Sequence, residues 1–310
     1  MSRPPESPPV AAAARAFLCA ACNGRVPIRA AEDGPLACPA CGRAYRWDGG
    51  ILVLSEASLE ADYPADVYTV LVQAEPRHFW FVERNRRIVS TLRGLLPEPA
   101  GRSVLDVGCG TGFVLAALER EGMLGCGLDM HLTGLRYARK RTRGLIVCEG
   151  ATRVPFAADF DVAMLCDVIE HVADDVAVLS STSSALKRGG IVVITVPALP
   201  FLWTTVDEAS GHHRRYTRSA LVAAIQSANL RVELVEYFNS ALLPVQIAQR
   251  IVLSMQHRQQ HHDDLRLLRK DLEPPPAWLN SMFGAACRLD AVLKRFDVPG
   301  PSLIAAARRI

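Results

Sequence analysis

The sequence lacks an apolar run long enough to cross a membrane. A spanning helix needs about 18 to 20 consecutive apolar residues, whereas residues 191–203, one of the longest apolar stretches, are interrupted by prolines. Prolines also fall within the first 17 residues, where a signal peptide requires a continuous apolar segment. We therefore expect residues 1–16 to form a flexible tail and the protein to be cytoplasmic, and a peripheral membrane contact stays compatible with this composition.

The sequence also lacks a strong excess of either charge. It has 35 basic and 32 acidic residues, for a net charge of +3. This balance argues against a partner that is bound mainly through a large electrostatic field, so nucleic acid is permitted but not implied. With 310 residues, half of them hydrophobic, the chain can bury one large core and still form a small second unit.

The nine cysteines show no disulfide framework, but four of them follow a metal-binding spacing. They form a C-x2-C-x15-C-x2-C pattern, made by Cys19, Cys22, Cys38 and Cys41. Two such knuckles can place four thiolates around a tetrahedral ion. We therefore predict a structural zinc ribbon over residues 17–56, in which four sulfur ligands leave no open position for catalysis.

The rest of the chain alternates between strand and helix patterns. Residues 57–98 are expected to be a helical lead-in whose main helix, near residues 79–96, has its "ERNRR" segment largely on the polar side. Residues 99–238 carry aliphatic strands separated by helices, which indicates a parallel sheet covered on both faces. Residues 239–301 are expected to form a helical insertion that covers the substrate, and residues 302–310 a final strand.

A glycine-rich turn follows the first strand of this alternation. In "VLDVGCGTGF" the strand reaches Asp106 and then meets Gly108, Gly110 and Gly112. Glycines there permit a tight turn and a close approach of backbone N–H groups to a ligand. A nicotinamide or flavin fingerprint would place glycine or alanine at position 113, which is Phe113. The carboxylate of Asp106 instead suits a cofactor that carries an ammonium and a sulfonium.

Taken together, these segments resemble the class I S-adenosylmethionine-dependent methyltransferases. The resemblance is carried by "VLDVGCGTG", "GLDM", "PF…FDVAMLCDVIEHV", "LKRGG" and "VITVPA", in the order of that family. It implies an α/β fold, namely a Rossmann-like sheet of seven strands, here with a small N-terminal zinc ribbon and a helical insertion before the last strand. It also implies S-adenosylmethionine as the cofactor.

The same resemblance implies which residues hold the cofactor. Asp106 and the three glycines would surround its methionine part, and Asp129, which ends the next strand, would hold the ribose. The remaining contacts would come from residues beside the adenine and at the closing edge of the pocket: Met130, Gly150, Ala151 and Asp167.

A group of acids and a histidine follows the fourth strand in "CDVIEHVADD". His171 could take a proton from an acceptor hydroxyl, with Glu170 orienting it or tuning its pKa. Alternatively, Glu170 only begins a helix and His171 is packing. The segment also resembles the E-x-x-E-H element of quinone-biosynthesis O-methyltransferases and small-RNA 2′-O-methyltransferases. That resemblance implies a divalent ion, magnesium, manganese or zinc, at Asp167, Glu170 and His171, with a further histidine from a later loop.

The later loop is "GHHRRYT", which concentrates hydrogen-bond donors after the fifth strand. Sheets of this kind bind their substrates near that edge. The candidate substrate residues are His212, His213, Arg214, Arg215 and Tyr216, of which either histidine could serve the ion. In the alternative interpretation, one arginine forms an internal ion pair with Asp207 or Glu208.

We therefore expect a methyltransferase that modifies an oxygen of a small-molecule, lipid or glycan-pathway acceptor. Two alternatives stay open. A four-cysteine ribbon before such a domain is similar to certain ribosomal-RNA methyltransferases, which would use the ribbon to recognise RNA. The protein could also bind S-adenosylmethionine without catalysis and act as a partner protein.

Overall fold

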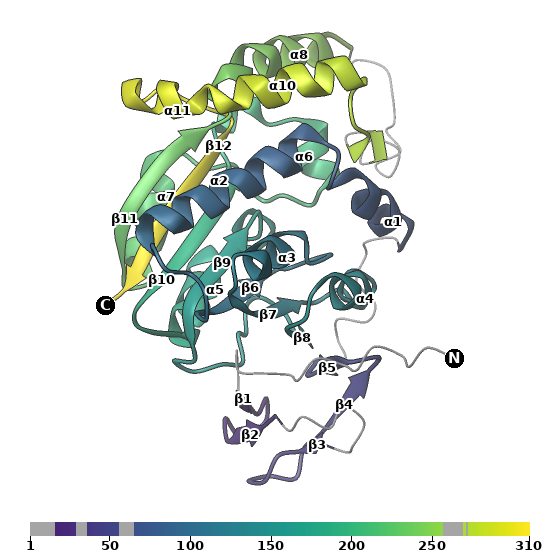
Figure 1. Ribbon diagram of the computed structural model, residues 1–310, viewed down its shortest axis with the longest axis vertical. Helices are drawn as coiled ribbons and strands as arrows, with labels where there is room; N and C mark the ends of the chain where they lie inside the picture. The colour runs from purple at the N-terminus through teal and green to yellow at the C-terminus, as the bar shows by residue number, and fades with distance from the viewer. Residues whose placement is uncertain (1–15, 29–35, 56–64, 257–268, 271) are drawn as a thin grey trace. The chain divides into compact units, whose positions relative to one another are not determined.

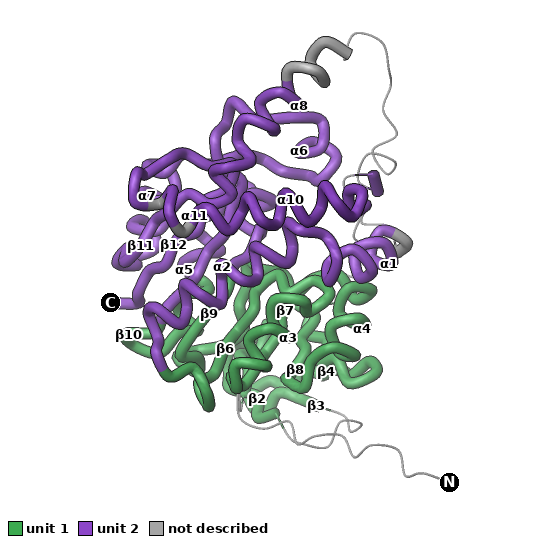
Figure 2. The backbone as a smooth tube through the Cα atoms, turned by 45° about the horizontal axis from the view of Figure 1, so that its top comes forward, with its two compact units in different colours: residues 1–61, 98–164, 181–190 green, residues 62–97, 165–180, 191–310 purple. Residues whose placement is uncertain are grey.

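The computed structural model describes residues 16–28, 36–55, 65–256, 269–270 and 272–310. The predicted tail, apart from Ala16, lies outside the described residues. The chain divides into two compact units, shown in green and purple in Figure 2. Unit 1 comprises residues 1–61, 98–164 and 181–190, and unit 2 comprises residues 62–97, 165–180 and 191–310.

Unit 1 is built on a sheet whose strands stand in the order β9, β6, β7, β8, β5, β4 and β3. Their bounds are Phe160–Cys166, Ser103–Val107, Leu124–Asp129, Leu145–Cys148, Ile51–Val53, Ala44–Asp48 and Leu36–Ala37. Strands β6, β7, β8 and β5 run parallel, while β4 and β3 are antiparallel. The parallel strands are almost wholly buried, as expected for aliphatic strands that are covered on both faces.

Two helices complete the alternation around the glycine turn, and Figure 1 shows them beside the sheet. Helix α3 spans Phe113–Arg120, between β6 and β7, and α4 spans Leu132–Arg141, between β7 and β8. Both helices lie within residues 99–238, where the sequence predicts helices between aliphatic strands. The predicted βα alternation is therefore confirmed in this part of the chain.

The ribbon is joined to this sheet by β5. Ile51 pairs with Ile146 and Leu52 pairs with Val147, in parallel register. The first hairpin, β1 (Ala16–Leu18) with β2 (Arg25–Pro27), lies outside the sheet. The sequence predicted a strand near β5 but not its partner, because a short apolar run does not show what it will pair with.

Unit 2 contains an antiparallel group of strands in the order β11, β12 and β10. These strands span Leu230–Phe238, Ser302–Arg309 and Leu186–Pro197. The final strand was predicted almost to the residue. Strand β10 includes the "KRGG" segment.

The described helices of unit 2 fall before, between and after these strands. They are α1 (Ala65–Ala74), α2 (Phe79–Leu95), α5 (Asp175–Ala185, which ends in unit 1), α6 (Thr205–Ala209), α7 (Arg218–Ser227), α8 (Leu243–Gln256), α10 (Ala277–Arg288) and α11 (Asp290–Leu293). Within the described part of the chain, none of the helices combines the length and apolarity needed to span a bilayer.

Helix α2 differs from the expected amphipathic pattern. Glu83, Arg84 and Asn85, which were expected largely on the polar side, are each at most 8% exposed. Burial of charged groups requires partners. Glu83 pairs with Arg86 and with Arg288 of α10, and Figure 1 shows α2 next to α10. The polar side of the helix is therefore part of the interior of unit 2.

Candidate active site

The glycine turn after β6 has the backbone conformation that its glycines permit. Gly108, Gly110 and Gly112 all have positive φ, a region that other residues rarely adopt. A side chain on Gly112 would also approach Ala138 of α4 to 3.0 Å. Gly110 shows no such crowding, so its positive φ alone requires glycine. The turn thus depends on these glycines for both conformation and packing.

Asp129, at the end of β7, is bound to this turn. One of its carboxylate oxygens accepts from the Gly110 N–H at 2.9 Å, and the other accepts from the His131 N–H at 2.8 Å. The His131 ring lies 3.1 Å from the same carboxylate. Asp106 is buried, with 1% of its surface exposed. Both acids that the sequence singled out therefore lie at the ends of adjacent parallel strands, β6 and β7.

The other predicted cofactor residues divide between the two units. Met130 is 41% exposed, and Gly150 and Ala151 follow β8 in unit 1. Asp167 belongs to unit 2. Its backbone has a φ of 56°, and its N–H donates to the carbonyl of Thr195 at 3.0 Å. A non-glycine residue in this conformation is held by its surroundings and often marks a functional position.

Two neighbours engage the Asp167 carboxylate. Thr195 donates its hydroxyl at 3.2 Å, and Arg84 of α2 forms an ion pair with the other oxygen. The Arg84 guanidinium also lies 4.6 Å from the centre of the Trp80 ring. The sequence gave no sign of this pair, because 83 residues separate Arg84 from Asp167.

Glu170 is the most unusual side chain of the site. It has no exposed surface, and neither carboxylate oxygen has a hydrogen-bond partner within the described part of the chain. Burial, followed by the negative charge of Asp167, raises the pKa of Glu170 well above its ordinary value. Native proteins rarely leave such a group without a partner, so its position calls for a proton or a bound cation.

Two histidines complete a cluster with Glu170. Glu170, His171 and His212, hereafter the Glu–His cluster, each bring one ligand-type atom to within 4.8 Å of the others. The rings of His171 and His212 meet edge to face, with centroids 4.6 Å apart. Although one side of His171 is exposed, protein surrounds the other. This burial, together with His212, lowers the pKa of His171 to about 4.

This cluster differs in one member from the ligand set that the resemblance implied, which stays a prediction. Asp167 was expected beside Glu170 and His171, but its carboxylate is bound to Arg84 and Thr195. Among the described residues, His212 joins the cluster instead. The loop histidine was anticipated only as one of two candidates.

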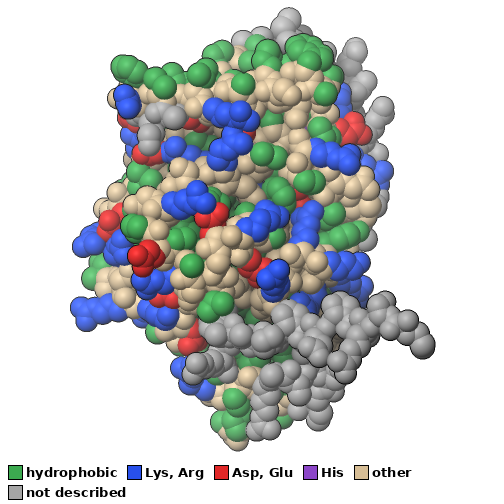
Figure 3. Space-filling model, viewed as in Figure 1, with side chains coloured by type: hydrophobic (Ala, Val, Ile, Leu, Met, Phe, Trp, Pro, Cys, Tyr) green, Lys and Arg blue, Asp and Glu red, His purple; other side chains and the backbone are tan. Residues whose placement is uncertain are grey.

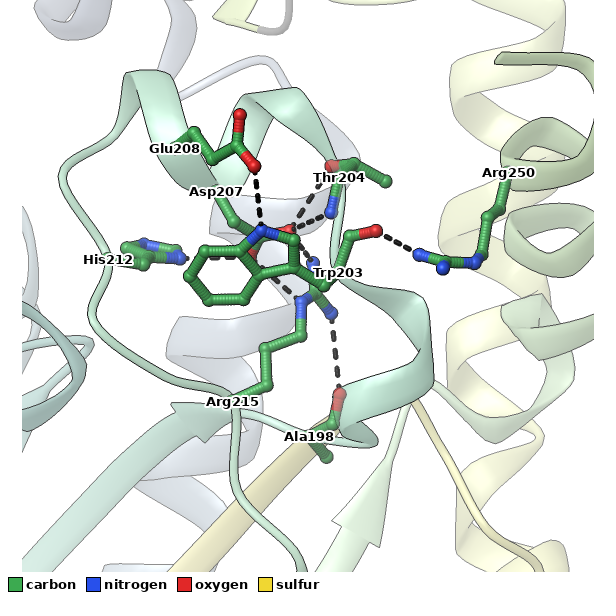
Figure 4. A network of polar contacts seen from close by, with 8 residues as sticks. All are labelled: Ala198, Trp203, Thr204, Asp207, Glu208, His212, Arg215 and Arg250. Carbon is green, nitrogen blue, oxygen red and sulfur yellow. Dashed lines mark hydrogen bonds and ion pairs between the residues drawn. The ribbon is translucent and has the colours of Figure 1, made fainter. Parts of the chain in front are cut away.

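His212 is held by a buried carboxylate, as Figure 4 shows. Its Nδ1 lies 2.9 Å from Asp207 of α6, which is only 1% exposed. Arg215 binds both oxygens of the same carboxylate, at 2.8 and 3.0 Å. Burial opposes ionisation, but the hydrogen bonds from His212 and Arg215 outweigh it and lower the pKa of Asp207 to about 2. With Nδ1 occupied, Nε2 is the nitrogen of His212 that can serve the cluster.

The other predicted substrate residues of this loop differ in exposure and in whether they already have partners. His213 is exposed, and its backbone N–H donates to the Glu170 carbonyl at 2.7 Å. Arg214 pairs with Asp175 at 3.2 Å, and Arg215 pairs with Asp207, one of the two acids proposed for it in the alternative interpretation. Tyr216 is buried and donates to Asp175 at 2.7 Å. Their role in substrate binding stays a prediction.

The four cysteines of the ribbon lie together in unit 1. Cys19 and Cys41 have their sulfurs 3.6 Å apart, as do Cys22 and Cys38, and all four lie within 4.8 Å of one another. Tetrahedral zinc with bonds near 2.3 Å would separate its sulfurs by about 3.8 Å. Backbone N–H groups and the Tyr45 hydroxyl, at 3.0 Å, donate to these sulfurs. The cluster fits the predicted zinc ribbon.

Comparison with known proteins fits this arrangement. A family model described as a methyltransferase domain matches residues 48–235, more than half of the chain. The chain belongs to this methyltransferase family. The resemblance noted in the sequence is therefore confirmed for the family, and the Rossmann-like fold is confirmed with it.

The curated relatives of this methyltransferase-family chain include ubiquinone biosynthesis O-methyltransferases. The protein from Vibrio vulnificus (strain YJ016) is 33% identical over 42% of this chain and 64% of its own length. The protein from Escherichia coli O6:H1 is 30% identical over 39% of this chain and 56% of its own length. The chain spans about half the length of the curated relatives that it matches.

Solved structures share the fold at low sequence identity. One is from a complex between the Haloferax volcanii Trm112 methyltransferase activator and a methyltransferase. It has a TM-score of 0.51 and 18% identity, and covers 80% of this chain and 99% of its own. Another, described as a sarcosine dimethylglycine methyltransferase from Galdieria sulphuraria, has a TM-score of 0.50 and 11% identity, over 74% and 86% of the two chains.

Proposed function

We propose that the protein transfers a methyl group from S-adenosylmethionine to a hydroxyl of a small-molecule or lipid acceptor. The observation that carries the acceptor side is the Glu–His cluster, which places a buried carboxyl group beside two imidazoles. Ligands of open parallel sheets bind beyond the carboxyl ends of the strands. The glycine turn follows β6, and Glu170 and His171 of the cluster follow β9, so each comes directly after the carboxyl end of a strand.

On the donor side, we assign binding to the residues around the glycine turn. Asp106 would attract the positive charges of the donor, and the turn would present backbone N–H groups to it. Asp129 would bind the ribose hydroxyls, since a carboxylate that already accepts from Gly110 and His131 retains further acceptor capacity. Met130, Gly150, Ala151 and Asp167 complete the proposed cofactor set, as the family resemblance implies.

On the acceptor side, we assign proton removal to the Glu–His cluster. His171, with a pKa of about 4, is neutral at physiological pH but a weak proton acceptor. His212 is better placed, because Asp207 fixes its ring and can stabilise the imidazolium that proton uptake would produce. We therefore propose His212 as the base, Asp207 as its positioning residue, and His171 and Glu170 as its neighbours at the acceptor oxygen.

The residues of the cluster also fit a divalent cation. Two imidazole nitrogens and a buried carboxylate without a hydrogen-bond partner among the described residues form a ligand set suited to manganese or zinc. When bound, such an ion lowers the pKa of a coordinated hydroxyl. Asp207 would hold His212 in the manner of the outer carboxylates that orient metal-binding histidines. We propose the ion at Glu170, His171 and His212 as the alternative to His212 acting as the base, because the free Nε2 of His212 cannot coordinate an ion and accept a proton at the same time.

An imidazole base favours an acidic acceptor, because an imidazole is only a modest proton acceptor. A phenolic hydroxyl has a pKa near 10, far below the value of about 15.7 for water, so it can be deprotonated by a modest base or with the help of an ion. The relatives named ubiquinone biosynthesis O-methyltransferase support an O-methylation of this type. We propose an aromatic hydroxyl as the acceptor and structural zinc at Cys19, Cys22, Cys38 and Cys41.

A labelling experiment tests this function against its alternatives. The full chain is incubated with S-adenosylmethionine labelled in the methyl group and with a cell extract that is then separated into small-molecule, lipid and RNA fractions. We expect label in a small-molecule or lipid product that forms an aromatic methyl ether, and much less of it with Glu170→Gln. Label in RNA would favour the ribosomal-RNA alternative. Donor binding by calorimetry with no labelled fraction would favour the non-catalytic alternative.

A further inference from the structure

A row of large apolar side chains lies exposed on α10, α11 and the turn of 3₁₀ helix that follows them, Lys294–Phe296. Five residues, each between 50% and 73% exposed, form what we name the outer strip: Trp278, Met282, Leu289, Val292 and Phe296. In Figure 3, apolar side chains gather along the upper edge, where Figure 1 places these helices. Single exposed apolar residues are ordinary, but five on one segment need a reason.

The outer strip is aligned along one side of the helical segment. At 3.6 residues per turn, its five positions fall within an arc of about 80°. Exposed Ala285 falls inside the same arc. The buried positions, Gly284, Cys287 and Asp290, fall on the opposite side and face the interior of unit 2. The segment thus has one side packed within the protein and an apolar side whose residues stay at least half exposed.

Two basic side chains lie beside the outer strip. Arg288 and Arg295 are both exposed and fall together along one border of the arc, about 80° to 100° from its centre. Arg288 pairs with buried Glu83 through its Nε, while 61% of its side chain stays exposed. The neighbouring acids have other partners. Asp290 is buried and accepts the N–H groups of Asn239 and Ser240, and Asp297 forms an ion pair with Arg218. The border therefore suits an anionic surface.

The composition of the outer strip and of its border favours a bilayer. Aromatic side chains bury about 150–250 Å² each, so five partly exposed apolar side chains offer on the order of 500 Å². A standard protein interface buries about 800 Å² per partner, of which somewhat more than half is apolar, so area alone does not separate a protein partner from a bilayer. Interfacial helices combine tryptophan, phenylalanine and leucine on one face with arginine beside them, which is the combination found here.

We propose that the outer strip binds the surface of an anionic lipid bilayer. Trp278, Met282, Leu289, Val292 and Phe296 enter the boundary between headgroups and acyl chains, and Arg288 and Arg295 contact the headgroup phosphates. This inference rests on the exposed side chains and is independent of the methyl-transfer proposal. It adds a peripheral attachment and does not involve a spanning helix.

Vesicle sedimentation tests the proposal with the full chain. The protein is mixed with vesicles of phosphatidylcholine alone or of phosphatidylcholine and phosphatidylglycerol in equal amounts. We expect binding to the anionic vesicles, weakened by salt, and a fall in partitioning of at least about tenfold for the double variant Leu289→Ser, Phe296→Ser. Arg295→Glu should also reduce binding to the anionic vesicles.

Ile310→Ser is the matched control, because Ile310 is 75% exposed and lies outside the outer strip. It should bind vesicles as the wild type does. The proposal is overturned if the wild type stays in the supernatant with anionic vesicles, or if the double variant with Leu289→Ser sediments like the wild type. It is also overturned if ultracentrifugation shows a dimer that this double variant abolishes while vesicle binding is absent. That last result would assign the strip to a second copy of the chain.

Discussion

Glu170 shows how strongly one residue can depend on groups that are distant in the sequence. Its carboxyl group is fully buried, and His212, 42 positions later, supplies one of the two rings beside it. His212 in turn is held by Asp207. If Glu170 is charged, the imidazoles alone offer it little compensation, which is why we expect a cation or a proton there.

The first prediction concerns the donor side. Asp106→Ala should abolish measurable binding of S-adenosylmethionine, because the buried carboxylate is the proposed partner of the positively charged donor. Calorimetric titration measures the affinity. Glu98→Ala, which removes an exposed carboxylate from the same unit, is the control and should bind normally. An unchanged affinity in Asp106→Ala would remove this residue from the proposed pocket.

The second prediction concerns Asp207. Asp207→Asn should lower the affinity of the Glu–His cluster for Mn²⁺ by about 10- to 100-fold, the usual cost of losing an outer carboxylate on a ligating histidine. Titration followed by electron paramagnetic resonance measures this affinity without any turnover. Glu208→Gln makes the same change of charge at the next residue of α6, where the carboxylate accepts only from Trp203 in Figure 4. Equal Mn²⁺ affinities in the two variants would contradict the role of Asp207.

The residues that were predicted from the sequence belong to motifs whose members lie close together along the chain. The cysteine spacing and the glycine turn each lie within a few tens of residues and use residue types with narrow uses. The role of Arg84 and the contact between Asp207 and His212 could not be found in this way. Arg84 lies within a helical pattern that predicts solvent, and the pairing of Asp207 with His212 depends on how the loop folds.

At the scale of the element, α2 has an unusual beginning. His78 is its N-cap, and its Nδ1 accepts the N–H of Trp80 at 3.1 Å. The side chain is only 9% exposed, and burial lowers the pKa of His78 to about 4. The cap therefore works only with a neutral ring, since a protonated Nδ1 cannot accept a hydrogen bond.

The third prediction follows from this cap. His78 binds a proton more weakly in the folded protein than in the unfolded chain. Between pH 6.5 and about 4 the unfolded state therefore takes up more protons, so the free energy of unfolding falls as the pH falls. His78 should contribute a loss on the order of 1–2 kcal/mol between pH 7 and pH 5.

Urea denaturation at the two pH values measures this difference. His78→Asn keeps a capping side chain without the titration, so it should lose less stability than the wild type. His213→Asn, at an exposed position, should behave as the wild type does. Identical pH dependence in all three proteins would show that His78 does not titrate in this range.

The sequence predicted most of the helices and strands, but it did not predict several of the tertiary contacts that they make. The strands and helices from β6 to β9 follow the expected pattern of apolar residues closely. The same pattern could not show that Glu83 and Arg84 are buried, because their partners come from α10 and from the residue that follows β9. Element boundaries depend on local chemistry, whereas the burial of a polar side depends on tertiary contacts.

At the scale of the whole molecule, the ribbon is linked to the rest of unit 1 by strand pairing and hydrogen bonds as well as by the peptide chain. Strand β5 pairs with β8, and Arg153 joins the two parts by donating to the Leu18 carbonyl at 2.9 Å while pairing with Glu149. Glu149 directly precedes Gly150, one of the proposed cofactor residues. The cysteine cluster and the proposed donor site are therefore connected within one hydrogen-bonded unit.

The fourth prediction tests this connection. Removal of zinc by a chelator, or the variant Cys38→Ser, should weaken binding of S-adenosylmethionine at least about tenfold, or roughly 1.4 kcal/mol, because loss of the ribbon loosens β8. Calorimetry of the metal-free and metal-loaded protein measures the affinity. The variant of buried Cys126, Cys126→Ser, controls for loss of a thiol outside the ribbon. Full affinity after complete zinc loss would show that the ribbon and the donor site are energetically separate.

The pairing of β5 with β8 also covers what would otherwise be an exposed edge strand. All four residues of β8 are buried, and β5 occupies the side of that strand away from β7. Deleting the ribbon would leave the backbone N–H and C=O groups of an apolar strand open to any other extended chain. By pairing with β8, the ribbon prevents this strand from pairing with another copy of the chain. We therefore expect a variant that lacks the ribbon to aggregate, even where its remaining core can fold.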